Sequence, residues 1–246
     1  MKTLGIIGFG EFGKLAAREL RDRFTVGAHD SHLEPQDIAA QGVTPFSLEA
    51  AAASDIVLIA VPVQAMEGVI AMLTPLVRPG ATVLDVASVK MLPSRWLERH
   101  MPETVHVVPT HPLFGPQSAA QGVAGRQLVI CPLRGDQHLK VAQIGEEMGM
   151  RVRITTAEEH DREMAFVQAL THLIGRSLSA MNIPDEMLKT QSYQHLLDLC
   201  GLIGNDSFEL FTAIQTLNPF AREVTEDFVA RAGDLLHHAY EGAKSD

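Results

Sequence analysis

Residues 3–13, TLGIIGFGEFG, decide the fold of this chain of 246 residues. The run Thr3–Ile7 is typical of a buried strand, and the glycines that follow have the spacing GxGxxG, from which a helical pattern begins. In such a turn Gly8 permits a tight bend, Gly10 lets the backbone approach a diphosphate, and Gly13 lets helix and strand pack closely. The turn and the helix N-terminus are therefore predicted to bind the diphosphate of a dinucleotide through Gly8, Phe9, Gly10, Glu11, Phe12 and Gly13.

Around this turn, short apolar runs alternate with helical patterns as far as residue 154. Further strands are expected at 24–28, 55–61, 81–86, 105–109, 127–131 and 151–154, and helices at 11–21, 64–76, 91–100 and 137–148. Because strands alternate with helices, we predict an α/β fold with a doubly wound, Rossmann-type parallel sheet.

The pattern changes at Thr156, which forms a capping-box signature with Glu159. Only helical periodicity follows, and the breaks in it fall at 183–184, 204–206 and 218–219. We therefore predict a dinucleotide-binding domain over 1–155 and an all-helical C-terminal domain over 156–246.

The helical part is rich in apolar residues, among them Leu196, Leu197, Leu199, Leu202, Ile203, Phe208, Leu210, Phe211, Ile214 and Leu217. They form either an ordinary core between paired helices or a surface that packs against a second copy. The second interpretation predicts a homodimer, with the C-terminal part as a dimerisation domain.

Charge and composition exclude several classes of protein. Asp and Glu outnumber Lys and Arg by 30 to 20, and the resulting net charge of −10 argues against binding to nucleic acid or to an anionic membrane. The longest apolar run, Ile56–Val63, is far shorter than the roughly 20 residues that span a bilayer. With only Cys131 and Cys200, and no histidine spacing typical of a metal site, we expect a cytoplasmic protein without a bound metal.

Asp30 follows the second expected strand, where an acidic residue accepts hydrogen bonds from the adenosine ribose. Its carboxylate would repel a 2′-phosphate, and no arginine follows it closely, so the sequence favours NAD over NADP. The alternative is that Asp30 only caps a turn. Val61 and Pro62, which end the strand 55–61, are expected to face the cofactor at the carboxyl edge of the sheet.

Two later segments lie at the same expected edge. DVASVK (85–90) ends one strand and carries Ser88, and THPLFGP (110–116) ends the next and carries His111. A histidine here is suited to accept a proton beside the nicotinamide, with the serine as its hydrogen-bond partner. The alternative is a solvated histidine in a loop.

Together these segments resemble those of the prephenate and arogenate dehydrogenases. The motifs GFGEFG, DVASVK, THPLFGP and EEHDREMAFVQALTH occur in that family's order, and the stretch 193–211 is most similar to the plant-type arogenate dehydrogenases and their bacterial relatives. The resemblance implies oxidative decarboxylation of a cyclohexadienol, in which a hydride passes to the nicotinamide and the ring becomes aromatic. It also implies that His111 takes the proton of the ring hydroxyl. Ser88 is expected to hydrogen-bond that hydroxyl or His111 and to bind the cofactor by lying against the nicotinamide.

The helix after Thr156 carries a polar stripe. At about 100° per residue, Asp161, Gln168, His172 and Arg176 fall within about an 80° arc, opposite Phe166, Leu170, Leu173 and Ile174. This stripe is either a solvated outer face or the lining of a cleft. The resemblance places His172 near the substrate, and a fork of donors suits Arg176 to a carboxylate. Lys90, Arg126 and Arg222 are alternatives to Arg176.

Substrate preference depends on two further positions. Plant-type enzymes that favour arogenate have an acidic residue where Gln121 stands here, and a neutral amide favours the keto acid, prephenate. The enteric-type enzymes have an arginine that binds a substrate carboxylate where this chain has Gln194, so the chain lacks that contact. Thr110, beside His111, is grouped with the substrate-binding residues.

The sequence therefore predicts an NAD-dependent enzyme that converts prephenate to 4-hydroxyphenylpyruvate in tyrosine biosynthesis. One alternative is an arogenate dehydrogenase, forming tyrosine with NAD or NADP, or a relative that acts on a modified prephenate. A more remote alternative is a dinucleotide-binding sensor without turnover, which would have no need of Ser88, His111 and His172 together.

Overall fold

The computed structural model describes residues 1–185, 188–204 and 206–242. The chain divides into two compact units, Met1–His160 and Asp161–Asp246. The division lies inside α7 (Ala157–Met164), slightly later than the boundary expected after residue 155. Among the described residues, no helix combines the length and the apolar character needed to cross a bilayer.

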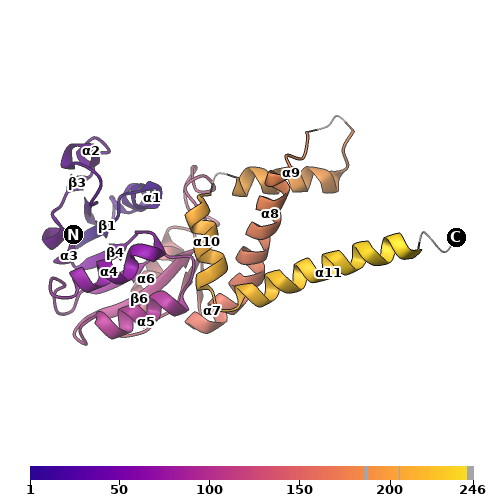
Figure 1. Ribbon diagram of the computed structural model, residues 1–246. Helices are drawn as coiled ribbons and strands as arrows, with labels where there is room; N and C mark the ends of the chain where they lie inside the picture. The colour runs from indigo at the N-terminus through magenta and orange to yellow at the C-terminus, as the bar shows by residue number, and fades with distance from the viewer. Residues whose placement is uncertain (186–187, 205, 243–246) are drawn as a thin grey trace. The chain divides into compact units, whose positions relative to one another are not determined.

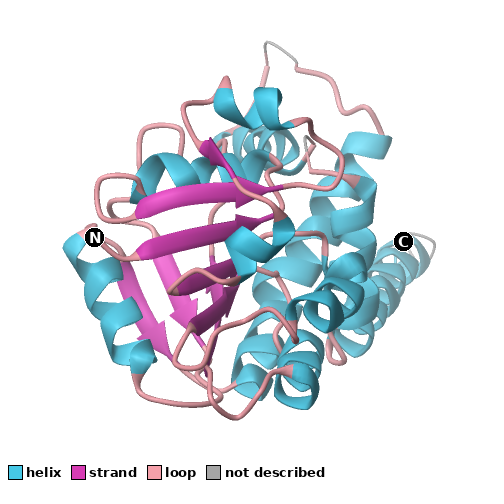
Figure 2. Cartoon of the chain, turned by 90° about the vertical axis from the view of Figure 1, so that its left-hand side faces the viewer, coloured by secondary structure: helices cyan, strands magenta, loops and turns pink. Residues whose placement is uncertain are grey.

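The first unit is built on an eight-stranded sheet with the order β3-β2-β1-β4-β5-β6-β7-β8 (Figures 1 and 2). Its strands are β1 (Thr3–Ile7), β2 (Thr25–His29), β3 (Thr44–Pro45), β4 (Ile56–Ile59), β5 (Thr82–Asp85), β6 (His106–Pro112), β7 (Gln127–Ile130) and β8 (Arg151–Ile154). The first six strands of this order, β3, β2, β1, β4, β5 and β6, are all parallel, as the sequence predicts for a doubly wound fold.

One pairing differs from the prediction of an all-parallel sheet. Strand β7 runs antiparallel to β6, with Thr110 opposite Ile130 and His111 opposite Val129. The segment between these strands contains no helix, and a parallel pairing requires a long crossover, usually helical. A helix does connect β7 to β8, and these two strands are again parallel.

The helices of the first unit agree closely with the sequence pattern where they are long. They are α1 (Glu11–Leu20), α2 (Pro35–Ala39), α3 (Leu48–Ala52), α4 (Val63–Leu73), α5 (Met91–His100) and α6 (Gln137–Glu147), followed by the start of α7. The sequence analysis missed α2, α3 and β3, because five residues or fewer are too short to show a period. The predicted capping box is confirmed: the Glu159 amide donates to the Thr156 hydroxyl, and the Thr156 amide donates to the Glu159 carboxylate.

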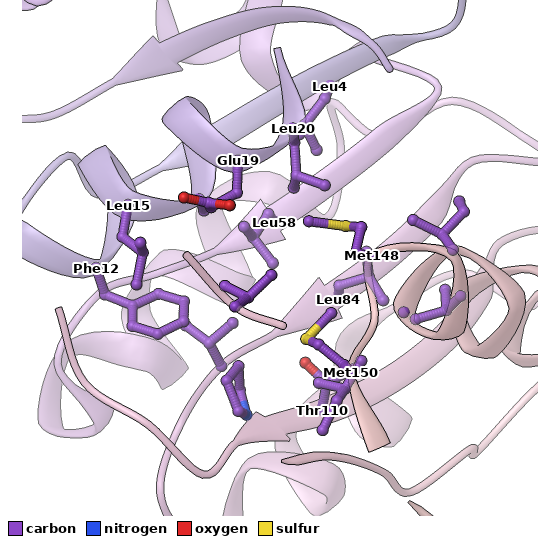
Figure 3. A pocket seen from close by; sticks show the side chains of 18 of the residues that line it. Leu4, Phe12, Leu15, Glu19, Leu20, Leu58, Leu84, Thr110, Met148 and Met150 are labelled. Atoms are coloured by element: carbon purple, nitrogen blue, oxygen red, sulfur yellow. The ribbon is translucent and has the colours of Figure 1, made fainter. Parts of the chain in front are cut away.

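An apolar cavity lies on one face of the sheet (Figure 3). Phe12, Leu15 and Leu20 reach it from α1, Leu58 and Leu84 line it from the sheet, and Met148 and Met150 close it from the end of α6. The space between the lining side chains, including solvent at its mouth, is about 830 Å³. Because its lining is almost entirely apolar, this cavity is unsuited to phosphates or to a dicarboxylate substrate.

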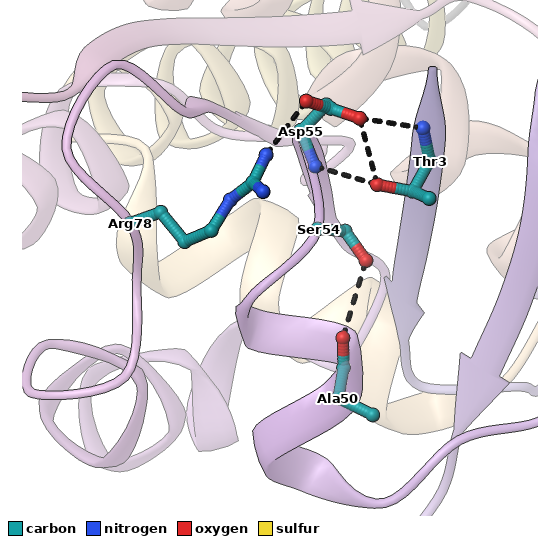
Figure 4. A network of polar contacts seen from close by, with 5 residues as sticks. All are labelled: Thr3, Ala50, Ser54, Asp55 and Arg78. Atoms are coloured by element: carbon teal, nitrogen blue, oxygen red, sulfur yellow. Dashed lines mark hydrogen bonds and ion pairs between the residues drawn. The ribbon is translucent and has the colours of Figure 1, made fainter. Parts of the chain in front are cut away.

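A polar network joins the amino ends of β1 and β4 (Figure 4). The amide and the hydroxyl of Thr3 both donate to Oδ2 of Asp55, at 2.8 and 2.9 Å, and Arg78 donates to Oδ1 at 2.6 Å. These donors, above all Thr3, lower the pKa of Asp55 to about 2. The network fixes the edge of the sheet opposite to the one where ligands bind in such folds.

In the described part of the second unit every regular element is a helix, as predicted. It contains the rest of α7, the π-helix η1 (Ala165–Leu170), α8 (Thr171–Ala180), α9 (Gln191–Ile203), α10 (Phe208–Leu217) and α11 (Ala221–Gly242). The breaks between α8 and α9 and before α11 fall where the sequence predicts them, as does the one between α9 and α10, although Asn205 lies outside the described residues. Within this unit α11 extends away from α8 and α9 (Figure 1).

Candidate active site

Four strand ends meet at the carboxyl edge of the sheet, in the spatial order β1, β4, β5, β6. The glycine turn follows β1, Val61 and Pro62 follow β4, Ser88 follows β5, and His111 lies near the end of β6. Because these strands are parallel, their ends form one continuous edge, where doubly wound folds bind their ligands.

The glycine turn has the backbone geometry that its spacing predicts. Gly8 has a φ of +95°, which side-chain-bearing residues rarely adopt. A Cβ at Gly13 would come within 2.2 Å of the Gly8 carbonyl oxygen, so helix α1 and the turn approach closely only without one. A Cβ added at Gly10 would have no other atom within 4 Å, so the space beside this backbone is open to a ligand. A diphosphate fits this turn, at the N-terminus of α1.

The other residues of the turn have different environments. Phe9 is buried with 1% of its surface exposed, whereas Glu11 is exposed and pairs with Lys14. Phe12 lies against Phe114, with ring centroids 6.3 Å apart. Phe9 is therefore buried and Phe12 half-buried, and the backbone of the turn is the part available to a phosphate.

Asp30 is tied to the glycine turn. One carboxylate oxygen accepts from the amide of Phe9 at 2.7 Å, and the other accepts from the amide of His32 at 2.8 Å. The carboxylate thus has the turn-capping role that was the alternative interpretation. Each oxygen has a second lone pair, so these bonds are compatible with acceptance from a ribose hydroxyl. Val61 also reaches the turn, since its Cγ1 would lie 2.8 Å from a Cβ on Gly8, while Pro62 is exposed.

His111 is buried, with 4% of its surface exposed, and its Nδ1 lies 2.8 Å from Nε2 of His160. The two rings meet edge to face, with centroids 5.0 Å apart and planes inclined by 66°. Burial, and then the charges of His160 and Lys90, hold the pKa of His111 well below its usual 6.5. At neutral pH the ring is therefore neutral, which is the state that can accept a proton.

Beside His111 lies a buried ion pair. Lys90 and Asp85 have side chains that are 0% exposed, and the ammonium donates to the carboxylate and, at 2.6 Å, to the carbonyl of Thr110. The Thr110 hydroxyl donates to the carbonyl of Asp85 at 2.5 Å. These bonds join the ends of β5 and β6 beyond their backbone pairing. They use the proton of the Thr110 hydroxyl and two donors of the Lys90 ammonium, while the oxygen of the Thr110 hydroxyl can still accept a hydrogen bond.

Ser88 differs from its expected arrangement. Within the described part of the chain, the imidazole of His111 has His160 as its hydrogen-bond partner, and no hydrogen bond joins it to Ser88. Ser88 lies half-buried in the loop after β5, between the two residues of the buried ion pair, Asp85 and Lys90. The other expected role of Ser88, a hydrogen bond to a substrate hydroxyl, stays a prediction.

In the second unit two residues of the polar stripe, Asp161 and His172, are buried, and the other two, Gln168 and Arg176, are half-buried. Asp161 and His172 are 0% and 8% exposed, whereas Phe166 and Val167 are 60% and 59% exposed. The wheel at 100° per residue also fails here, because η1 turns by fewer degrees per residue than an α-helix. The side chain of Gln215 donates to the carbonyl of Ala169 at 2.8 Å, within this irregular stretch.

His172 and Arg176 share a neighbour in Asp206. Nε2 of His172 lies 3.7 Å from the Asp206 carboxylate, and burial lowers the pKa of His172 even though Asp206 acts to raise it. Arg176 donates to the carbonyl of Asp206 and lies over the rings of Phe208 and Phe211. Three buried atoms of the stripe have no hydrogen-bond partner among the described residues, namely Oε1 of Gln168, Nδ1 of His172 and Nε of Arg176. A buried polar atom without a partner costs free energy, so these three atoms mark the stripe as a place where a polar partner would be stabilising.

The remaining predicted residues are less constrained. Gln121 is exposed in the loop after β6. Two other residues of this loop, Ala119 and Val123, pack against Leu15 of α1. Arg126 is exposed, and Arg222 pairs with Glu226 one turn along α11. Of the carboxylate partners considered, Arg176 retains an unsatisfied buried donor, while Lys90 and Arg222 are engaged elsewhere.

Sequence reasoning missed the role of His160 and the pairing of Asp85 with Lys90. The contact of His160 with His111 joins α7 to β6, which lie 49 residues apart in the chain. Asp85 and Lys90 are close in sequence, but Lys90 also donates to the carbonyl of Thr110 on the neighbouring strand β6, a contact that no local pattern shows. A weak signal existed for the pair, since an aspartate that ends a buried strand and a lysine five residues later are unusual so close to a core.

Two family models match the chain. Residues 25–154 match the nucleotide-binding domain of prephenate dehydrogenase, and residues 177–233 match the TYRAAT1-like C-terminal domain. The first match contains Ser88, the Asp85–Lys90 pair and His111.

Curated and solved relatives agree with these models. A probable arogenate/prephenate dehydrogenase of Methanocaldococcus jannaschii is 32% identical over 95% of the chain and 56% of its own length. Chloroplastic arogenate dehydrogenase 2 of Arabidopsis thaliana is 29% identical over 91% of the chain and 66% of its own. The chain therefore spans 56% and 66% of these relatives. The crystal structure of prephenate dehydrogenase from A. aeolicus, in complex with hydroxyphenyl propionate and NAD+, has the same fold, with a TM-score of 0.78, 20% identity and coverage of 99% of this chain and 92% of that one.

Proposed function

Since this chain belongs to the prephenate dehydrogenase family, we propose that it catalyses the oxidative decarboxylation of prephenate to 4-hydroxyphenylpyruvate with NAD. The observation that carries the proposal is His111, a buried imidazole with a depressed pKa at the same sheet edge as the glycine turn. A neutral base in this position is what removal of a hydroxyl proton requires.

The residues divide the chemistry among them. His111 accepts the proton of the ring hydroxyl as the carbonyl forms, and Ser88 hydrogen-bonds that hydroxyl from the end of β5. The nicotinamide nucleotide, when bound, supplies the hydride acceptor. Release of carbon dioxide then makes the ring aromatic, which provides much of the driving force. The chain itself therefore has to orient the ring and hold the proton.

The proposed cofactor site is the glycine turn with Asp30. The open space at Gly10 and the free amides of α1 suit a diphosphate, and the carboxylate at the end of β2 suits an unphosphorylated ribose. NAD is therefore proposed over NADP, because a 2′-phosphate would meet the charge of Asp30. His172, Arg176 and Thr110 remain proposed substrate contacts, although the Thr110 hydroxyl already donates to the protein backbone.

Arogenate is the second candidate substrate, since arogenate dehydrogenases are among the relatives. The two substrates differ in one side-chain group, an amine in arogenate and a keto group in prephenate. Gln121 offers no charge to an amine, which favours prephenate.

Steady-state rates with both substrates and both nucleotides test the proposal. We expect the highest kcat/KM with prephenate and NAD. A higher kcat/KM with arogenate would make arogenate the substrate. It would also mean that Gln121 does not set the preference, so Gln121→Glu should then have little effect on the ratio of the two kcat/KM values. No turnover in any of the four combinations, with NAD still bound, would favour the remote alternative of a sensor.

A homodimer through the second unit is proposed as well. Among the described residues of its own unit, helix α11 packs mainly against η1 and α10. It exposes Val229, Leu235, Leu236 and Tyr240 by 58–73%. An apolar surface of this kind is typical of an interface between copies. Light scattering should give a dimer for the natural chain and a monomer for Leu235→Lys combined with Leu236→Lys.

A further inference from the structure

We propose that His160 is a positioning residue that keeps the proton of His111 on Nδ1 and so leaves Nε2 of His111 able to accept the substrate proton. The contact of 2.8 Å between Nδ1 of His111 and Nε2 of His160 carries this inference. It rests on the proposed function, because it assigns His111 the role of base.

The contact imposes a choice on both rings. When two neutral imidazoles share one N–H···N bond, one nitrogen carries the proton and the other does not. If Nδ1 of His111 donates, its Nε2 keeps a free lone pair and can act as a base. If His160 donates instead, Nε2 of His111 already holds a proton and cannot accept another. The acceptor state of His160 is therefore the one that the reaction needs.

Both rings are held so that the choice is maintained. His160 is 2% exposed and lies in the first turn of α7, where its amide donates to Thr156 in the capped start of the helix. His111 is fixed from the other side, since Lys90 and Thr110 tie the end of β6 to β5. Two anchored backbones bring the rings edge to face, so rotation of either ring would break the bond.

The bond also favours the charged state that forms during the reaction. When His111 takes the substrate proton, its Nδ1–H becomes part of a cation, and a hydrogen bond to a charged donor is stronger than one between neutral groups. Burial opposes this cation, as do a positive charge on His160 and the charge of Lys90, so His160 has to be neutral to act as the acceptor. The acceptor nitrogen of His160 offsets part of that cost, and an interaction that strengthens toward the transition state raises kcat more than it lowers KM.

Two substitutions of His160 separate an acceptor from mere bulk. His160→Leu fills much of the space but has no acceptor, and we expect kcat to fall about 10- to 100-fold, less than the 10²- to 10⁴-fold that general-base catalysis is typically worth. His160→Gln places an amide oxygen near the position of Nε2, and we expect kcat within about fivefold of the natural chain. NAD affinity and the KM for prephenate should change little in either variant. Equal loss in the two variants would overturn the proposal.

A double-substitution cycle adds a test that a structural role would fail. In a His111→Asn background the base is already gone, so His160→Leu should lower the remaining rate less than about twofold, because residues that act as a unit are not additive. An additional loss as large as that in the natural background would mean that His160 acts independently of His111.

Nitrogen-15 NMR of the imidazoles reads the tautomer without any substrate. In the natural chain we expect His111 to be protonated on Nδ1 and unprotonated on Nε2, and in His160→Leu we expect this preference to be lost. Protonation of His111 on Nε2 in the natural chain would overturn the proposal even in an active enzyme. Absence of turnover, by contrast, would overturn the proposed function and leave the tautomer to be decided by the spectrum.

Discussion

The two edges of the sheet each carry a polar network, and the networks are built differently. At the amino edge, Asp55 and Arg78 have side chains that are 35% and 49% exposed, and both oxygens of Asp55 accept hydrogen bonds. At the carboxyl edge, Asp85 and Lys90 are 0% exposed, and Oδ1 of Asp85 has no partner among the described residues.

The difference separates a structural tie from a site built for chemistry. Charges that remain near water lose little hydration and need only ordinary hydrogen bonds. Charges that are fully buried cost free energy unless they are paired, and they shift the pKa of their neighbours. At the carboxyl edge the buried charges of Asp85 and Lys90 lie next to His111, the base of the proposed reaction, and the charge of Lys90 helps to lower the pKa of His111. Buried charge with a perturbed histidine therefore marks the functional edge more clearly than the apolar cavity does.

Replacement of His111 should produce the largest change. His111→Asn is expected to lower kcat about 10²- to 10⁴-fold, because the base is lost. The dissociation constant of NAD should stay unchanged, since the glycine turn lies at β1. Steady-state rates with prephenate and NAD titrations measure the two effects. His106→Asn is the matched control, a histidine on the same strand with a side chain 30% exposed, and it should leave kcat unchanged. An unaltered kcat in His111→Asn would remove the chemical distinction between the two edges.

Breaking the buried pair should give the largest change in stability. Lys90→Met leaves the Asp85 carboxylate buried without its cation, which typically costs about 3–5 kcal/mol in the free energy of unfolding. Urea denaturation measures this loss. Asp85→Asn combined with Lys90→Met removes both charges and should recover a large part of it. A loss below about 1 kcal/mol in Lys90→Met would place this edge in the class of exposed pairs.

The sequence predicts what depends on local pattern and misses what depends on distant contacts. The strand before the glycine turn, helix α5 and the capping box at Thr156 agree with the structure, because neighbouring residues determine them. The direction of β7 has no signature in an apolar run of four residues. The π-helix cannot be read from a wheel that assumes 3.6 residues per turn. The partner of His111 lies 49 residues away, so no local pattern reveals that it is His160 rather than Ser88.

At the amino edge the same kind of substitution should have a smaller effect. Asp55→Asn keeps an oxygen for Thr3 but loses the charge that strengthens the bonds from Thr3 and Arg78. Because the site is partly exposed, we expect a loss of about 1 kcal/mol in urea denaturation. Arg78→Met, which removes only the exposed partner, should cost less than about 0.5 kcal/mol. A loss in Asp55→Asn equal to that in Lys90→Met would show that exposure does not distinguish the two edges.

The pH dependence of stability should separate the two edges at the finest scale. The pKa of folded His111 is below 6.5, so as the pH falls through 6.5 the unfolded chain binds a proton that the folded chain does not, and stability decreases. Asp55 has a folded pKa of about 2 against 3.8 in a free side chain, so its contribution is complete above pH 3.8 and is lost as the pH falls toward 2. Urea denaturation across this pH range should therefore show two separate declines. His111→Asn should flatten the upper one in part, since burial also lowers the pKa of His172. Asp55→Asn should flatten only the lower one, and in part, since the pKa values of Glu49, Asp136, Glu147 and Glu159 are lowered as well. An effect of Asp55→Asn near pH 6.5 would contradict the separation of the two declines.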